Sequence, residues 1–254
     1  MLFRLLRLVA FYGGLVGIWW LVAKAEIWPP YLLPSPDDVK QSLQTNLENG
    51  RIQEALKLSL QRLAIGYTIS FFIGVTIGIL SGSFRWLDET LGSLILGIQS
   101  LPSITWVPLA ILWFGLNDRA MIFIVLMGSI FSIAISARDG VRSMPPLYHR
   151  VAHTLGANRL QSLRYVVVPA MLPSMVQGLK LGWSFSWRSL MAGELILASA
   201  GGLGNLLGFG RDLNDMSLVL AIMVVIVAVG LVVDMLIFAR LEGWVRERWG
   251  LAGA

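Results

Sequence analysis

The only two histidines of the chain, His149 and His153, are four residues apart, which places both imidazoles on one face of a helix. Two imidazoles at this spacing can hold a metal ion when further ligands complete the site. No Asp or Glu occurs between Gly140 and Gly193, and the chain contains no cysteine. We therefore expect no metal site here, and we interpret the pair as part of a surface that contacts another protein.

Three further ionisable side chains, Lys180, Arg188 and Glu194, lie within the otherwise apolar stretch Leu172–Leu197. Ionisable groups at membrane depth are costly and usually face a cavity or a partner helix. Arg188 falls near the middle of the stretch, where a fixed positive charge would attract an anion. Two interpretations stay open for Arg188 and Glu194, a pathway for solute and structural ion pairs with other helices. Lys180 lies nearer one end and can extend its ammonium group to the interface.

The helical repeat gives this stretch two different faces. At about 100° per residue, small residues share one side, where a neighbouring helix can approach closely: Gly178, Gly182, Ser189 and Gly193. The opposite side carries Lys180, Ser184, Trp187 and Glu194, with Arg188 at its margin. The candidate pathway residues are therefore Ser184, Trp187, Arg188 and Glu194.

The composition predicts an integral membrane protein. Of 254 residues, 56% are hydrophobic and 14% are charged, and the mean hydropathy is +0.71, whereas soluble domains carry about a quarter charged residues. Long charge-free runs alternate with short polar segments, and a bilayer span needs about 20 apolar residues. We predict an all-α protein with six transmembrane helices, at Leu8–Ala23, Leu63–Phe84, Thr90–Asn117, Ala120–Ala137, Leu172–Leu197 and Met216–Val233.

The distribution of basic residues predicts the orientation. The pI is near 9.9, but the arginines are spread among short loops rather than gathered in one stripe, which excludes nucleic acid as a partner. Six spans with both termini in the cytoplasm place more basic residues inside than outside. The N-terminal segment also resembles a signal peptide with a cleavage site at Ala23-Lys24-Ala25, but the bulky Trp19 and Trp20 favour a retained first span.

Local signals predict the connections. Pro36-Asp37-Asp38 opens a helix that runs to about Leu47, and Asn49-Gly50 marks a turn. In the second span, small residues at four-residue intervals predict close packing on another helix: Ser70, Gly74, Gly78 and Gly82. Pro102 or Pro108 is expected to kink the third span. We expect Gly201–Gly210 to form an outer loop, not a phosphate loop, because it lacks the Gly-Lys-Ser/Thr ending. Asp234 is expected to pair with a basic group.

The segment Arg150–Pro169, RVAHTLGANRLQSLRYVVVP, has the spacing of a recognisable motif. It resembles the "EAA" motif of permease subunits in binding-protein-dependent ABC importers, in which Glu-Ala-Ala is followed by Gly and later by aliphatic, any residue, aliphatic and Pro. Gly156, Val166, Val168 and Pro169 occupy the expected positions, and Arg150 stands in place of Glu. PSITWVPLAILWFG, at Pro102–Gly115, is similar to permeases of the sulfonate, nitrate and taurine type.

The resemblance implies a type I importer fold with a short cytoplasmic coupling helix. It implies three domains: a first helix with an external connector (1–55), a permease core (56–240) and a cytoplasmic tail (241–254). It further implies a second copy of the permease, two cytoplasmic ATP-binding subunits and an external solute-binding protein, in a bacterial inner membrane. ATP and Mg²⁺ would be held by the ATPase, and this chain would have no cofactor and no catalytic activity. The residues expected at the ATPase contact are His149, Arg150, Ala152, His153, Gly156, Ala157 and Pro169.

The solute is less well defined by the sequence. Permeases that resemble this chain carry sulfonates, taurine, nitrate or bicarbonate, and relatives carry vitamin precursors; Arg188 favours an anion, and aliphatic sulfonate or taurine is the preferred hypothesis. A stand-alone secondary transporter is the alternative from another class. An intramembrane hydrolase is excluded because no Ser/His or His/Glu pair has catalytic spacing within the spans.

Overall fold

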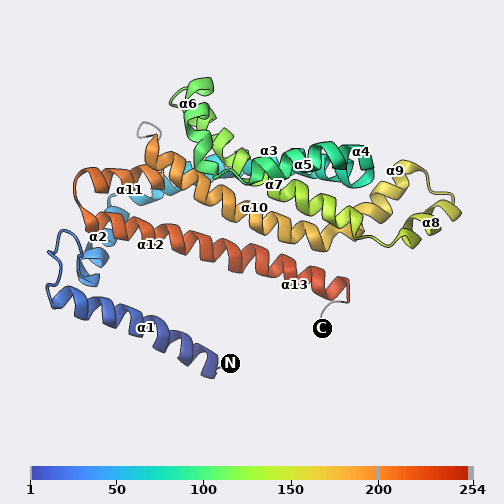
Figure 1. The fold of residues 1–254 in the computed structure, drawn as a ribbon. Helices are drawn as coiled ribbons and strands as arrows, with labels where there is room; N and C mark the ends of the chain where they lie inside the picture. Colours follow the sequence, from blue (N-terminus) through green and yellow to red (C-terminus); the bar gives the residue numbers. More distant parts are fainter. Residues whose placement is uncertain (1, 198–200, 251–254) are drawn as a thin grey trace. The chain divides into compact units, whose positions relative to one another are not determined.

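The computed structural model describes residues 2–197 and 201–250, and this part of the chain consists of helices and turns without a strand (Figure 1). The four longest helices are α3 (Arg51–Ser83), α7 (Asp118–Arg142), α10 (Val168–Ile196) and α12 (Met216–Val233). The prediction of an all-helical protein is confirmed.

The helices belong to two compact units, which α3, α10 and α12 all share. One unit combines Met1–Ser59 with Glu194–Ala228, and it contains α1 (Leu2–Lys24), α2 (Pro36–Glu48) and α11 (Leu203–Asp212). The other combines Leu60–Gly193 with Val229–Ala254. Its further helices are α4 (Arg85–Leu87), η1 (Asp88–Gly92), α5 (Ser93–Gln99), η2 (Ser103–Trp106), α6 (Val107–Phe114), α7, α8 (Pro146–Thr154), α9 (Arg159–Ser162), η3 (Leu163–Val167), η4 (Asp234–Phe238) and α13 (Ala239–Arg248).

Helix α2 begins where the sequence predicts it. Ser35 is the N-cap residue: the Asp38 N–H donates to Ser35 Oγ at 3.2 Å, and the Ser35 N–H donates to Asp38 Oδ2 at 2.9 Å. This capping box satisfies two backbone donors that a helix start would otherwise leave without partners. The Trp19 indole N–H donates to the Pro34 carbonyl at 3.1 Å, which ties α1 to the connector before α2.

Three helical stretches among the described residues are long and apolar enough to cross a membrane: α3, α7 and the continuous run Met216–Arg248. The bent pair Arg85–Gln99 and Ser103–Phe114 makes a fourth if it forms one span. Helix α1 contains a shorter apolar stretch, Ala10–Lys24, and α10 carries three ionisable residues along its length. A protein with several apolar spans is thus confirmed, while the count of six stays a prediction.

The third predicted span is broken rather than gently kinked. The two halves of the pair are bent by 96°, and the break falls at Ser100–Pro102, between α5 and η2. Pro102 has no N–H to continue the helix, and its ring disfavours helical geometry at Leu101. Pro108 lies in the first turn of α6, where a proline removes no hydrogen bond. Of the two candidate prolines, Pro102 therefore marks the bend.

The predicted stripe of small residues on α3 packs against α7. A Cβ added to Gly74 would lie 2.9 Å from the Ile130 carbonyl, and one added to Gly78 would overlap Ala134 and Ala137. Only glycine permits this backbone approach, which in a membrane supplies packing contacts that the hydrophobic effect cannot. The prediction of close helix packing along this stripe is confirmed.

The small-residue face of α10 packs against α7 as well, as the sequence predicts. Cβ atoms added to Gly182 and Gly193 would lie 3.1 Å from Ile133 and Ile124, respectively. Helix α7 therefore lies between α3 and α10, and Figure 1 shows α7 and α10 running alongside each other. The core at this packing consists of Ile133, Ala137, Val141, Met144, Val167, Met171 and Met175.

Ion pairs hold further helices of the same unit. Arg62 Nη2 lies 2.7 Å from Asp118 Oδ1, which joins α3 to the start of α7. Lys180 Nζ lies 2.9 Å from Asp234 Oδ1 and 3.3 Å from Glu242 Oε1. The expected basic partner of Asp234 is therefore Lys180. Lys180 thus has two carboxylate partners, and its position at the membrane interface stays a prediction.

The expectation of a glycine-rich loop at Gly201–Gly210 is also wrong, because most of this segment forms α11. Ser59 Oγ accepts from the Leu203 N–H at 2.9 Å, and Glu194 Oε2 accepts from the Gly204 N–H at 3.0 Å. These two side chains cap the start of the helix and supply the acceptors that its first N–H groups need. The glycines inside α11 allow close packing: a Cβ on Gly210 would lie 3.1 Å from Val219.

Candidate functional site

The predicted coupling segment forms a separate short helix between two long ones. Helix α7 continues beyond the end of the predicted span at Ala137 and ends at Arg142. Helix α8 follows after Ser143–Pro145, with Pro146 as its first residue. In Figure 1, α8 and α9 extend beyond the ends of α7 and α10, so α8 lies at one tip of this unit.

Gly156 ends α8 by a Schellman motif. The Gly156 N–H donates to the His153 carbonyl at 2.9 Å, and the Ala157 N–H donates to the Ala152 carbonyl at 3.0 Å. This pattern requires left-handed backbone at the residue after the cap, which is usually glycine. Gly156 has φ +77°. The left-handed backbone at this position explains why the EAA-like pattern has a glycine there. Ala152 and Ala157 take part in the same turn.

The exposed face of α8 is apolar. Leu147, Val151 and Leu155 follow one another at four-residue intervals, and Leu155 is 80% exposed. A small cavity of about 340 Å³ opens beside this face, between α8 and η3. It is lined by Leu147, Tyr148, Val151, Ala152, Leu155 and Val166. Exposed apolar surface of this kind, on a short helix at the tip of a unit, is typical of a protein–protein contact.

The remaining predicted coupling residues lie around this face. His149, Arg150 and His153 are exposed, and Pro169 is half-buried in the first turn of α10. No group of three His, Asp or Glu side chains with metal-binding geometry occurs among the described residues, so His149 and His153 lack a third ligand there.

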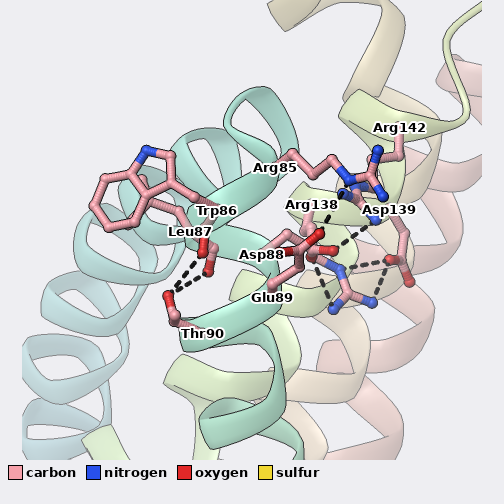
Figure 2. Close-up of polar contacts among 9 residues, drawn as sticks. All are labelled: Arg85, Trp86, Leu87, Asp88, Glu89, Thr90, Arg138, Asp139 and Arg142. Atoms are coloured by element: carbon pink, nitrogen blue, oxygen red, sulfur yellow. Dashed lines mark hydrogen bonds and ion pairs between the residues drawn. The ribbon is translucent and has the colours of Figure 1, made fainter.

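A cluster of charges stands directly before α8, at the end of α7 (Figure 2). Asp88, the first residue of the π-helical turn η1, lies between two arginines of α7. Its Oδ2 is 2.7 Å from Arg142 Nη1, and its Oδ1 is 3.5 Å from Arg138 Nη1. Arg138 also binds Asp139 at 2.9 Å. The Asp88 side chain is only 15% exposed. Its ion pairs with Arg138 and Arg142 join the helical stretch α4–η1–α5 to the end of α7.

A second cavity, of about 430 Å³, lies among α5, η2, α7 and α10. Of the four predicted pathway residues, Arg188 alone lines it. The guanidinium lies 5.0 Å from the centre of the Phe185 ring, and Arg188 Nε donates to the Ser184 carbonyl at 3.0 Å. The cavity wall includes Ser132, whose buried hydroxyl has no hydrogen-bond partner among the described residues.

The other three predicted pathway residues have different surroundings. The Trp187 ring is buried and stacks on Trp183, with 6.0 Å between the ring centres. Ser184 Oγ donates to the Lys180 carbonyl within α10. Glu194 is fully buried, and the single hydrogen of the Ser59 hydroxyl is shared between its two carboxylate oxygens, which lie 2.9 Å (Oε1) and 2.8 Å (Oε2) from Ser59 Oγ. Their contacts are those of packing and capping, and a pathway role for them stays a prediction.

Sequence reasoning missed Asp88 and Ser132. The partners of Asp88 are about fifty residues away in the chain, and no local sequence pattern indicates them. Ser132 is one of several serines in an apolar span, and hydroxyls there ordinarily bond to their own helix. Only the absence of such a bond in the structure distinguishes it.

These features define an all-helical membrane protein of several spans, with a short exposed helix between two long ones. The sequence profile of the family described as "Binding-protein-dependent transport system inner membrane component" matches residues 74–247, and the chain belongs to this family. It is therefore a multi-pass inner-membrane permease component of an ABC transporter, non-catalytic and without a cofactor of its own. The family implies an ATPase and a binding protein as partners.

Relatives are similar over most of the chain. A putative ABC transporter permease of Methanocaldococcus jannaschii is 34% identical over 86% of this chain and 83% of its own length. The taurine transport permease TauC of Escherichia coli is 29% identical, over 91% and 86%. The bicarbonate transport permease CmpB of Synechococcus elongatus is 33% identical, over 75% and 66%.

The fold is similar to that of a solved transporter. A chain of the MetNI methionine ABC transporter, in an inward-facing conformation, superposes with a TM-score of 0.66, at 19% identity, over 76% of this chain and 94% of that chain. This similarity concerns the fold alone.

Proposed function

We propose that this chain is the translocation subunit of an ATP-driven importer for a small organic anion, with an aliphatic sulfonate or taurine as the preferred solute. Two copies of the chain would assemble with two cytoplasmic ATP-binding subunits and receive solute from an external binding protein. The observation that carries the anion assignment is Arg188, a cationic side chain in the wall of a cavity among the spans.

Helix α8 is the proposed coupling helix. Its apolar face and the adjoining cavity would fit a groove on an ATPase, and the polar side chains of His149, Arg150 and His153 flank that face. Helix α8 is joined to α7 by only three residues, Ser143–Pro145. A displacement of α8 by the ATPase would therefore act directly on α7, which packs against α3 and α10.

The proposed orientation places α8 and both chain ends in the cytoplasm, with six spans. Reporter fusions test it: fusions after Ser143 and Trp249 should read as cytoplasmic, and fusions after Gly50 and Asn214 should read as external. A cytoplasmic signal at Gly50 would contradict the six-span arrangement, since it would remove α1 as a span.

The test of the anion assignment is uptake by the reconstituted complex. Removing the charge with Arg188→Met, which keeps much of the side-chain volume, should reduce taurine uptake at least about tenfold, because the solute would lose a charge-assisted hydrogen bond. Arg188→Lys should retain part of the activity, since it keeps the charge but loses the forked geometry. Normal uptake by Arg188→Met in a complex of normal thermal stability would contradict the assignment.

Bicarbonate is the second candidate solute, because the similar permease CmpB is named for bicarbonate transport. Sulfonates, taurine and bicarbonate all carry an oxyanion group, so Arg188 serves either candidate. Competition separates them: excess ethanesulfonate should suppress taurine uptake, whereas suppression by bicarbonate alone would favour the second candidate.

A further inference from the structure

We propose that the permease itself holds a binding site for the oxyanion head group of a small organic anion, formed by Ser132 of α7 and Arg188 of α10. The site lies in the cavity of about 430 Å³. This inference rests on the proposed function and adds to it a selectivity step within the membrane, beyond the choice made by the external binding protein.

The first observation is that the hydroxyl of Ser132 is buried without a hydrogen-bond partner among the described residues. Ser132 is 5% exposed, and its Oγ has no hydrogen-bond partner among the described residues. Nearby buried serines do find acceptors: Ser129 Oγ and Ser186 Oγ donate to the Val125 carbonyl at 3.1 and 2.9 Å. A buried hydroxyl without a partner is costly. In the cavity wall, it offers a donor that a ligand oxygen would satisfy.

The guanidinium of Arg188 is the second, independent observation. Only its Nε is engaged, by the Ser184 carbonyl, and the two terminal nitrogens meet no acceptor among the described residues. Such a pair of N–H groups matches two oxygens of a carboxylate or sulfonate. The guanidinium also lies over Phe185, which keeps it in place without neutralising its charge.

The rest of the wall indicates what the head group is attached to. No Asp, Glu or Lys is among the described residues that line the cavity, so Arg188 gives it a net positive charge. Most of the wall is apolar, with Met127, Phe131 and Trp106 among its residues. A cavity of this size and character fits a small ligand with a few polar anchors. The expected ligand is a monoanion with an oxyanion head and a short apolar body.

Direct binding tests the site without the external binding protein. The full-length permease, purified in nanodiscs with its ATPase subunits, is titrated with ethanesulfonate by calorimetry. We expect saturable binding, weakened at least about tenfold by Ser132→Ala, since a hydrogen bond to a charged group is lost, and weakened further by Arg188→Met. Ser129→Ala is the matched control, because it removes a hydroxyl of the same helix outside the cavity, and its affinity should equal that of the wild type.

Further probes identify the chemistry of the ligand. Propionate should bind with similar affinity, nitrate more weakly because it has no apolar body, and ethylammonium should not bind. Ser132→Thr, which restores a hydroxyl, should recover affinity. Thermal unfolding of every variant is compared with the wild type, so that a loss of binding is read only from folded complexes.

Several results would overturn the site: no saturable ethanesulfonate binding by the wild type, unchanged affinity in Ser132→Ala, or equal binding of ethylammonium. Failure of the proposed transport function has a different signature. In that case the wild-type complex would bind ethanesulfonate in a Ser132-dependent manner, and yet no anion would be taken up with ATP and the binding protein present.

Discussion

Arg142 Nη1 lies 2.7 Å from Asp88 Oδ2, so the carboxylate at the start of η1 is bound to the last residue of α7. Only Ser143–Pro145 separate this arginine from α8. The contact therefore connects the bent helices α4–α5 to the base of the proposed coupling helix (Figure 2). A π-helical turn at Asp88 is notable here, because such turns are often found at functional sites.

We predict that Asp88→Asn weakens both stability and coupling. Two arginines would lose their shared carboxylate, and we expect a loss of about 1–3 kcal/mol in the free energy of unfolding, together with reduced stimulation of ATPase activity by the loaded binding protein. Glu89→Gln is the control, because its partner Arg85 is exposed and the pair is confined to one helical turn. Equal behaviour of the two variants would refute a special role for Asp88.

Gly156 gives a second prediction. Because its φ is +77°, Gly156→Ala should destabilise the end of α8 by about 1 kcal/mol, and Gly156→Asn by less. Nothing lies within 4 Å of a Cβ built there, so a side chain points into free space. Gly156→Asp should insert normally and yet uncouple ATP hydrolysis from transport, because an unpaired carboxylate would be desolvated by the docked ATPase.

The comparison of Gly156→Asp with Gly156→Asn isolates the charge, since both residues tolerate left-handed backbone. ATPase stimulation in the reconstituted complex is the measurement. If the two variants stimulate alike, the effect belongs to the backbone and the docking interpretation of Gly156 fails. Arg150→Glu should be mild in the same assay, because Glu stands at this position in the EAA motif that the segment resembles.

The sequence predicted the elements better than it predicted the contacts between distant residues. The four-residue spacing of Ser70, Gly74 and Gly78 has one physical use in a membrane helix, close packing, and the structure confirms it. The glycines of α11 led to the wrong prediction of a loop, because glycine normally disfavours a helix. The cap that starts α11 comes from Ser59, 144 residues away from Leu203, and no local pattern reveals such a contact.

A third prediction concerns pH and the start of α2. Hydrogen bonds from the Ser35 hydroxyl and backbone N–H hold the pKa of Asp38 below its usual value of 3.8. A lowered pKa in the folded state means that the capping box adds stability above that usual value and loses it as the pH falls through the lowered pKa. Hydrogen exchange in α2, corrected for intrinsic rates, should therefore show a protective effect of Asp38 at pH 6 that disappears near pH 2.

Asp38→Asn measures that effect, because its amide does not titrate, and Asp37→Asn is the control, since Asp37 is outside the capping box. The difference in α2 protection between wild type and Asp38→Asn should shrink as the pH falls. A difference that is constant from pH 6 to pH 2 would show that the carboxylate charge has no part in the cap.

The last prediction concerns Glu194, which is fully buried and bonded to Ser59 Oγ and the Gly204 N–H. A side chain at Gly202 would overlap its carboxylate, and Gly202 has φ +104°, so the turn before α11 is built around this group. Glu194→Ala should lower the free energy of unfolding by about 1–3 kcal/mol, because buried donors would lose their acceptor, and should increase hydrogen exchange in Leu203–Asp212. Glu48→Ala, at the end of α2, is the control. If Glu194→Ala instead abolished transport while stability and exchange stayed normal, the capping role would be wrong and a pathway role for Glu194 would be favoured.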